Sequence, residues 1–423
     1  MKNKSINNEV TDVNIKIIDS PMGFGKTSYL IQMINEDMDN NKYMYITPFL
    51  DEVDRIEINC KDKKFYQPNN KAKNGSKLES LKKLISQGKN IVSTHALFSM
   101  ADEELIMLIK SEGYILILDE VMDVVEQVSI KKDDINMLLE QEIIEIQEKP
   151  YNKVVWLKDD YDGKFNDIKS MAYNESLYYV NNTLMIWTMP VNAFKSFSEI
   201  YISTYLFDAQ IQKYYYDYFN IDYIYYHIEK ENNKYLLIKT TDFDYDKEFK
   251  LQAKQLINII DNPKLNAVGD YIGKSKSALS KSWYIKYKDE EVMKTLNKNL
   301  TNFFRKYCTD KSELHMWTTF KEYKAILKGK GFTKGFVPCN SRATNQYSNK
   351  TNCAYVLNRY LNPFYNNFFN QRNIEIDEDK FALSEMLQWI WRSAIRNNES
   401  INLYIPSERM RTLLLNFMNI ASK

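Results

Sequence analysis

The segment Ile15 to Met33, IKIIDSPMGFGKTSYLIQM, constrains the fold more than any other part of the chain. Its first four residues predict a short buried strand, and the residues from Ser28 onward predict a helix. Between them Ser20 to Thr27 follow the pattern GxxxxGK[ST], with serine in the first position. Glycine is rare in this chain, only 11 of 423 residues, so two glycines within this loop carry weight.

The loop has the chemistry of a phosphate-binding site. Gly23 and Gly25 allow the backbone to curl so that its N–H groups point at phosphate, and the helix start adds partial positive charge. Lys26 is expected to reach the β- and γ-phosphates, and the Thr27 hydroxyl to bind Mg²⁺. The alternative, a chance glycine turn before a helix, is less favoured because the strand–loop–helix context is the required one. The residues expected to bind nucleotide are Ser20, Met22, Gly23, Phe24, Gly25, Lys26, Thr27 and Ser28.

A second stretch supplies the acidic groups that such a site needs. Tyr114 to Leu118 predict a buried strand, and Asp119 and Glu120 follow at its end, where ligands of open α/β sheets gather. Asp119 is expected to hold Mg²⁺ and Glu120 to polarise the attacking water. A solvated strand end is the alternative. Asp123 is expected to be a carboxylate on a helix surface.

The composition of the chain argues against several classes of protein. Lys+Arg is 57 and Asp+Glu is 56, so the net charge of +1 excludes a globally basic polyelectrolyte but not a local basic groove. The four cysteines form no CxxC pair and the three histidines lie far apart, which argues against a zinc module or a disulfide framework. The polar first residues, and the lack of any apolar run near about 18 residues, predict a protein of the cytoplasm without a membrane span.

Ser20 to Thr27 (SPMGFGKT) and Leu118 to Val125 (LDEVMDVV) resemble motifs I and II of superfamily 2 helicases. Within this superfamily the chain resembles the herpesvirus origin-binding proteins and the DEAD/DEAH-type helicases of phages and plasmids. It implies an α/β fold of two tandem RecA-like P-loop NTPase domains, with parallel sheets flanked by helices and a cleft between them. It also implies ATP with Mg²⁺ in that cleft. The expected partners are single-stranded or forked DNA and proteins of replication or regulation, in the cytoplasm of a bacterial host. The expected role is ATP-dependent movement along nucleic acid, or unwinding of it, in phage or mobile-element replication.

Further segments are similar to the remaining motifs mainly in their order. Motif III is placed at Ser203 to Tyr205, in preference to a rival placement at Leu184 to Met189. Motif IV is placed at Leu314 to Phe320, and motif V at 335–345. The residues expected to contact the nucleic-acid backbone are Thr47, Thr94, Thr318 and Asn340. Each of these positions has the alternative of a strand end or a solvated loop.

The segment Gln388 to Arg396 resembles motif VI, with Trp391 in place of glycine. If the segment is one helix, Gln388, Arg392 and Arg396 follow at i, i+4 and i+8 on one face. That face is expected to insert an arginine at the γ-phosphate, as an arginine finger that stabilises the charge of phosphoryl transfer. Which arginine does so stays open, and the alternative is an amphipathic helix with solvated arginines.

The expected domains are 1–230, with a helical insertion at 127–182, and 231–423, which would open with a strand at Lys234 to Lys239. Gly273 to Ser275 lacks the pattern of a second P-loop. Leu279 to Trp283 is interpreted as a surface turn anchored by the tryptophan, rather than as a nucleic-acid contact.

Two other functions stay open. One is an ATP-gated binding switch that recruits replication factors without processive unwinding. The other is a packaging-type motor with a nuclease domain, which would need metal-binding carboxylates. The candidates for those carboxylates, better interpreted as a solvated turn before a helix, are Glu375, Asp377, Glu378 and Asp379.

Overall fold

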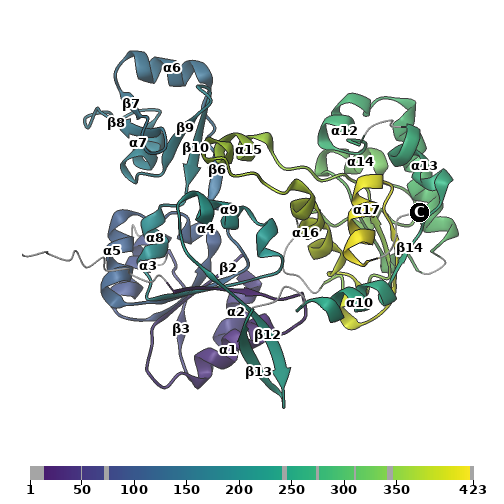
Figure 1. Ribbon diagram of the computed structural model, residues 1–423, viewed down its shortest axis with the longest axis horizontal. Coiled ribbons are helices and arrows are strands. Elements are labelled where there is room, and N and C mark those ends of the chain that lie inside the picture. The colour runs from purple at the N-terminus through teal and green to yellow at the C-terminus, as the bar shows by residue number, and fades with distance from the viewer. Residues whose placement is uncertain are drawn as a thin grey trace, which may run out of the picture.

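The computed structural model describes residues 14–48, 50–70, 76–240, 245–272, 276–308, 311–340 and 346–419. Three sheets organise this part of the chain: an eight-stranded, a five-stranded and a four-stranded sheet. We call the parts built on them the first lobe, the middle region and the second lobe (Figure 1). Gly273 to Ser275, and residues 341–345 of the expected motif V, lie outside the described ranges.

The first lobe is a three-layer α/β/α sandwich. Its strands run parallel except for the edge strand β13, which is antiparallel to β12. In spatial order they are β13 (Lys234–Lys239), β12 (Ile224–Glu231), β1 (Asn14–Asp19), β11 (Glu199–Thr204), β5 (Ile115–Asp119), β2 (Tyr43–Thr47), β4 (Asn90–Thr94) and β3 (Phe65–Tyr66).

Alternate residues of these strands enter two separate cores, as the two-residue period of a strand dictates. Ile18 packs with α1 (Lys26–Glu36) and α2 (Leu50–Asn59) on one face. Ile15 and Ile17 pack into the core of the other face. The remaining helices of this lobe are α3 (Lys77–Ser86), α4 (His95–Phe98), α5 (Glu103–Glu112), α8 (Val191–Lys195) and α9 (Ile211–Tyr218), with the single turn η1 (Phe207–Ala209).

The structure corrects the expected helical insertion, because the middle region is built on a five-stranded antiparallel sheet as well as two helices, with its own small core. In spatial order its strands are β6 (Val125–Gln127), β10 (Leu184–Thr188), β9 (Leu177–Val180), β8 (Lys153–Trp156) and β7 (Ile144–Gln147). Two helices, α6 (Lys132–Glu140) and α7 (Asn166–Tyr173), supply apolar residues to that core. Short strands with alternating burial, such as β8, give a weaker sequence signal than a helix of the same length.

The second lobe holds an all-parallel sheet of β14 (Ile257–Ile259), β17 (Ile401–Tyr404), β16 (Asn352–Tyr355) and β15 (His315–Thr318), in that spatial order. Its longer helices are α10 (Lys247–Leu256), α12 (Lys281–Tyr287), α13 (Glu291–Lys306), α15 (Pro363–Phe369), α16 (Glu378–Ile390) and α17 (Glu408–Phe417). Its shorter turns are α11 (Pro263–Ala267), η2 (Val268–Ile272), η3 (Ser312–Leu314), η4 (Lys321–Tyr323), α14 (Lys324–Leu327), η5 (Thr333–Gly335), η6 (Asn370–Arg372) and η7 (Ala394–Asn397).

The hairpin β12–β13 belongs to the first sheet, so Lys234–Lys239 is not the opening strand of the second lobe. The expected boundary at residue 230 therefore falls inside a hairpin. The polar residues at its tip, Asn232 and Asn233, adopt positive φ as a tight turn requires, and that polarity resembles a linker in sequence.

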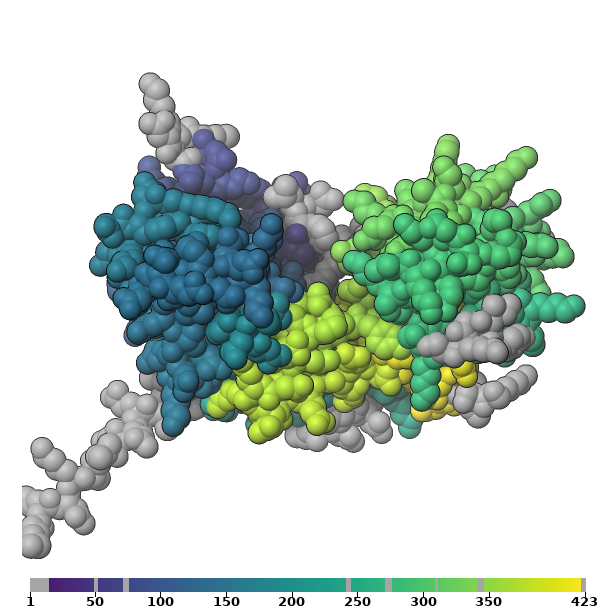
Figure 2. Space-filling model, turned by 90° about the horizontal axis from the view of Figure 1, so that it is seen from above, coloured from purple at the N-terminus to yellow at the C-terminus, as the bar shows by residue number. Residues whose placement is uncertain are grey.

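One segment of the second lobe packs against the first lobe. Phe364, Phe368 and Phe369 of α15 are part of the same core as the first lobe. Phe368 stacks on Tyr218 of α9 with ring centroids 4.5 Å apart. Arg372 lies over Tyr151 of the middle region. In Figure 2 the yellow-green atoms of this segment bridge the blue middle region and the green second lobe. We call residues 361–377 the arm.

Among the described residues, no helix is both long enough and apolar enough to cross a membrane.

Candidate functional site

The loop after β1 is held open by the strands beside it. Ser20 N donates to Thr204 O at 3.0 Å, and Ser20 Oγ accepts from Ile228 N at 2.8 Å. Gly23 and Gly25 both have φ of 87°, a conformation that side-chain-bearing residues rarely adopt. A Cβ on Gly25 would also lie 2.1 Å from Cε1 of Tyr235, so the hairpin covers this glycine directly.

Lys26 is the first helical residue after the loop. Its Nζ donates to Ser20 O at 2.6 Å and to Pro21 O at 3.1 Å. Burial lowers the pKa of Lys26, while the negative charges of Glu120, Asp19 and Asp119 act in the opposite direction. The ammonium is thus held against carbonyl oxygens of the loop, facing the carboxylates of the neighbouring strand.

Asp119 ends β5 beside Thr27. Asp119 Oδ2 accepts from Tyr45 OH at 2.9 Å and lies 3.5 Å from Thr27 Oγ1. Burial, and then the charge of Glu120, raise the pKa of Asp119 to about 6. One hydroxyl and one carboxylate at this distance fit Mg²⁺, which takes few protein ligands and completes its shell with phosphate and water.

Glu120 turns out of the strand with a φ of 78°, and its N donates to Ser203 O at 2.9 Å. This left-handed turn places Glu120 Oε2 3.5 Å from Thr204 Oγ1, which donates to it. The end of β11 therefore lies against the acidic pair. The rival segment Leu184–Thr188 is β10 of the middle sheet.

Asp19 is a residue that the sequence did not single out. Its two carboxylate oxygens accept from Leu206 N at 2.8 Å and from Phe207 N at 2.9 Å. Leu206 has a φ of 56°, so the carboxylate stabilises a left-handed turn directly after β11. Burial raises the pKa of Asp19 to about 6, against the opposing effect of these N–H donors.

The second lobe completes a pocket of about 270 Å³ over the loop. The expected motif VI residues Gln388, Arg392 and Arg396 line it together with Lys26, Asp119 and Glu120. The expected single helical face is wrong, however, because α16 ends at Ile390 and Arg396 lies in η7. Leu387 to Ile395 are all buried except Gln388, which is half-buried, so packing rather than helical period directs these side chains.

The two arginines differ in their surroundings. Arg392 is 6 % exposed, whereas Arg396 is exposed on the turn that follows. Loss of solvent around Arg396 lowers its pKa, with a smaller opposing effect from Glu52. The charge of Arg396 in turn lowers the pKa of Lys26.

An aromatic cluster joins the loop to the second lobe. Phe249 of α10 lies 6.0 Å from Phe24, 5.3 Å from Tyr205 and 4.3 Å from Trp391, between ring centroids. Phe24 therefore packs toward the second lobe and does not line the pocket, and neither does Ser20. The other expected nucleotide-binding residues do line it: Met22, Gly23, Gly25, Lys26, Thr27 and Ser28.

The same pocket holds residues that the sequence did not indicate. Glu52 and Arg55 lie three residues apart on α2 and pair at 3.1 Å. Thr47, expected to contact nucleic acid, is buried and lines this pocket instead.

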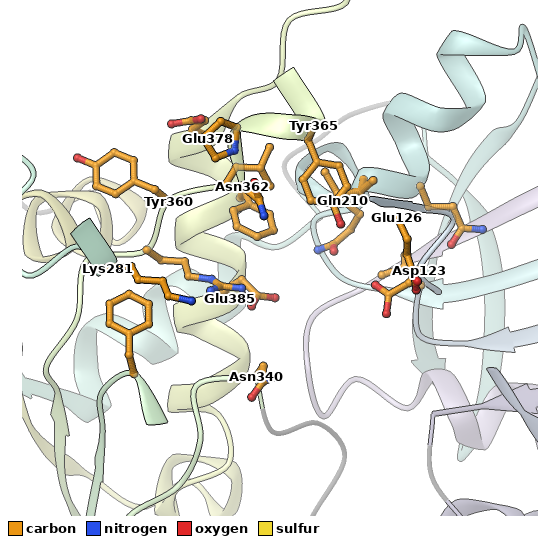
Figure 3. A pocket seen from close by; sticks show the side chains of 18 of the residues that line it. Asp123, Glu126, Gln210, Lys281, Asn340, Tyr360, Asn362, Tyr365, Glu378 and Glu385 are labelled. Carbon is orange, nitrogen blue, oxygen red and sulfur yellow. Dashed lines mark ion pairs between the residues drawn. The ribbon is translucent and has the colours of Figure 1, made fainter. Parts of the chain in front are cut away.

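A larger groove of about 1250 Å³ lies between the lobes. Figure 3 shows Asp123 and Glu126 on the side of the first lobe, opposite α16 with Glu385 and the nearby Lys281. Asp123 is not on a helix, because residues 121–124 form an irregular segment before β6.

Of the residues expected to contact nucleic acid, Asn340 lines this groove. Thr318 is buried in β15, and Thr94 precedes α4, whose His95 and Ala96 line the groove in its place. Leu279 to Trp283 opens α12: Ser280 caps the helix and Trp283 is buried. Lys281 of the same segment lines the groove and lies 3.6 Å from Glu322.

The acidic residues interpreted as a solvated turn, which are also the candidates for nuclease carboxylates, lie around the start of α16. Asp377 caps that helix by accepting from Lys380 N at 2.9 Å. Asp379 pairs with Arg409 at 2.6 Å. Among the described residues, no group of three or more His, Cys, Asp or Glu side chains is arranged to hold a metal ion.

Comparison with known families gives two matches. A family described as the YonV C-terminal Rossmann-like domain matches residues 251–418, and one described as the YonV middle domain matches residues 125–187. The SPbeta prophage-derived protein YonV of Bacillus subtilis (strain 168) is 44% identical over 414 residues, covering 96% of this chain and 98% of that protein.

Solved structures give weaker likenesses. An XPD helicase aligns over 97% of this chain and 96% of its own, with a TM-score of 0.45 and 12% identity. S. tokodaii Xpd4 aligns over 97% and 95%, with a TM-score of 0.38 and 11% identity. The DUF1998 helicase MrfA, bound to DNA and AMPPNP, aligns over 97% of this chain and 49% of its own, with a TM-score of 0.35 and 10% identity. At these scores the likenesses carry no conclusion about function, and the similarity to herpesvirus origin-binding proteins stays a prediction.

Proposed function

The chain belongs to the YonV family, and from this premise and the geometry of the nucleotide pocket we propose that it is a nucleic-acid-dependent ATPase of the superfamily 2 helicase type. Its two lobes would be RecA-like domains that close on ATP. The 44% identical relative is prophage-derived. We therefore propose that this chain moves on DNA during phage replication in the bacterial cytoplasm.

One observation carries the proposal. A single pocket is lined by the P-loop residues Gly25, Lys26 and Thr27, by the acidic pair Asp119 and Glu120, and by Arg392 and Arg396 of the other lobe. Phosphoryl transfer needs this combination: a cradle for the phosphates, a carboxylate that orients water, and a cation brought to the transferring phosphoryl group.

The residues divide the chemistry as follows. Lys26 leaves the carbonyl oxygens of Ser20 and Pro21 and binds the β- and γ-phosphates of ATP. Glu120, held by its backbone bond to Ser203 and beside Thr204, orients the attacking water. Thr27 and Asp119 would hold Mg²⁺, which would neutralise part of the phosphate charge.

Arg396 is the better candidate for the arginine finger. It is the exposed one of the two arginines, and its charge acts on Lys26. Arg392 is buried and adjoins Trp391, which packs on Phe249, so it is placed to position the loop rather than to move toward phosphate.

The first experiment is ATP hydrolysis by the purified chain, with and without single-stranded DNA, beside Lys26→Ala. We expect DNA-stimulated turnover that falls by about 10²–10³-fold in the variant, the usual effect of removing a preorganised charge from a transition state. Lys61→Ala, on an exposed lysine of the first lobe, is the matched control. Equal turnover in wild type and Lys26→Ala would refute the assignment.

A second candidate, an ATP-gated switch without processive unwinding, is favoured by the arm. Three phenylalanines of the arm lie in the core of the first lobe, so wide opening of the lobes would expose them. A strand-displacement assay separates the two: DNA-stimulated ATPase without displacement supports the switch, and displacement coupled to turnover supports the helicase.

A further inference from the structure

The charge of the chain is distributed unevenly over its parts. The middle region, residues 125–187, has seven Lys and twelve Asp and Glu, a net charge of −5. Residues 276–334 of the second lobe have fourteen Lys and Arg against six Asp and Glu, a net charge of +8. The whole chain is nearly neutral at +1, so this segregation is hidden in its composition. An enrichment in lysine along the whole chain would not produce it.

A dense part of this positive charge follows Phe320, which lines the groove. Residues 320–330, FKEYKAILKGK, carry four lysines and one glutamate, and all four lysines are exposed. The buried side chains of Tyr323 and Leu327 anchor η4 and α14 beneath them. We call Lys281, Lys298, Lys321, Lys324, Lys328 and Lys330 the lysine patch.

Contacts join the segments that carry these exposed lysines. Lys281 pairs with Glu322 at 3.6 Å, which joins the start of α12 to η4. Asn297 Nδ2 donates to Ile326 O at 2.9 Å and to Lys328 O at 3.2 Å. Lys298 therefore lies next to the residues that follow α14.

The patch is not neutralised within the protein. In the described part of the chain, Lys281 pairs with a carboxylate, whereas Lys298, Lys321, Lys324, Lys328 and Lys330 have none within ion-pair distance. The surface is thus available to a polyanion. It also adjoins the groove, since Lys281 and Phe320 line the groove.

The groove itself differs in charge. Asp123, Glu126, Glu378 and Glu385 line it, against Lys281 and Arg359, and Arg359 is engaged by Glu385 at 3.5 Å. A phosphate backbone would therefore find more attraction outside the groove than within it.

We propose that the lysine patch holds the phosphate backbone of a DNA duplex that adjoins the strand in the groove. This rests on the proposed function, and it names the forked form of the substrate. Several exposed lysines without carboxylate partners bind backbone phosphates without reading sequence. The acidic middle region on the first lobe repels the same duplex. The uneven charge of the molecule thus orients the fork with its duplex on the second lobe.

The test uses the full chain and two fluorescent DNA probes. One is a single strand of about ten nucleotides, within the site size of single-strand grooves. The other is the same strand extended into a duplex at one end. Binding of each is measured over a range of salt concentrations, for wild type and for a variant with Lys321→Gln, Lys324→Gln, Lys328→Gln and Lys330→Gln.

We expect the variant to lose salt dependence on the duplex-bearing probe, by about 0.9 in the slope of log K against log salt for each phosphate contact removed. Its binding to the short strand should not change. The matched control neutralises four exposed lysines of the first lobe, Lys61, Lys64, Lys77 and Lys83, and should leave both slopes as they are.

The outcomes separate this proposal from the previous one. If wild type binds neither probe, the proposed function fails. If wild type binds the short strand but the variant keeps the full slope on the duplex-bearing probe, only the lysine patch is refuted. An equal loss on both probes, or an equal loss in the control, also refutes the patch. So does capture of wild type but not of the variant by phosphatidylserine vesicles, with duplex binding unchanged.

Discussion

The nucleotide pocket and the groove lie between the same two lobes, yet they are built differently. The pocket measures about 270 Å³ and is lined by Lys26 after β1, by Asp119 and Glu120 at the end of β5, and by Arg392 and Arg396 after α16. The groove measures about 1250 Å³ and is walled by longer segments, including the arm.

The pocket and the groove also differ in the charge of the residues that line them. A site that performs chemistry on a phosphate needs cations at fixed positions. A groove along which a strand moves needs weak contacts, and an excess of carboxylates over cations weakens the binding of a phosphate backbone. Under the proposed function, the pocket would bind its nucleotide tightly and the groove would guide a strand loosely.

The largest expected effect is at the pocket. Arg396→Ala should lower ATP turnover by about 10³-fold or more, since a finger arginine stabilises the charge of the transferring phosphoryl group. Steady-state hydrolysis with single-stranded DNA present measures it, and Arg305→Ala, on an exposed arginine of α13, is the control. Full activity in Arg396→Ala together with its loss in Arg392→Ala would reverse the roles of the two arginines.

The second effect concerns the arm beside the groove. Phe368→Ala removes a fully buried ring that stacks on Tyr218, and should lower the free energy of unfolding by about 3–5 kcal/mol. Chemical denaturation measures the change, with Phe368→Leu as a milder replacement. A loss below about 1 kcal/mol would mean that the arm is not packed into the first lobe in solution.

The third effect lies behind the pocket, at Asp19. Its pKa is raised to about 6 from 3.8, so the stabilisation gained by protonating it in the folded state is complete below about pH 4. That stabilisation is lost as the pH rises through 6, and it amounts to about 3 kcal/mol at 1.36 kcal/mol per pKa unit.

An amide at this position does not titrate. The difference in free energy of unfolding, wild type minus Asp19→Asn, should therefore fall as the pH rises from 4 to 7. Asp119 titrates in both proteins and cancels in the difference. A difference that stays constant with pH would contradict the raised pKa of Asp19.

The smallest expected effect is in the groove. The double variant Asp123→Asn and Glu126→Gln should bind a single strand about three-fold more tightly at low salt, since each exposed charge contributes a few tenths of a kcal/mol and salt screens it. ATP turnover without DNA should not change. Asp133→Asn with Asp134→Asn, on α6, is the control; unchanged strand affinity in the groove variant would refute the loose-guidance interpretation.

The sequence predicts which residues of the loop and of the acidic pair come together, because that geometry is local. Gly23, Gly25 and Lys26 follow a strand directly, and Asp119 and Glu120 end another, so parallel strands bring them to one edge. The parallel sheets of both lobes follow from the same strand–loop–helix spacing.

Other parts of the site depend on contacts between distant residues. Arg396 reaches the pocket through a turn after α16, not along its face, and no helical period reveals where a buried helix stops. Phe249, which joins Phe24 to Trp391, lies on a helix whose sequence resembles any amphipathic helix. The arm and the middle sheet were not predicted for a similar reason. The sequence of a short apolar segment does not indicate which hydrophobic core it packs into.

The contact between Gly25 and Tyr235 has an evolutionary consequence. Because any side chain at position 25 would collide with the ring at position 235, the loop and the hairpin cannot diverge independently. Since the positive φ already selects glycine at position 25, the constraint is expected to appear at position 235, where the ring occupies the space that a Cβ would need. A lineage that shortens the hairpin removes the steric barrier to substitution, although the positive φ of 87° still selects glycine there.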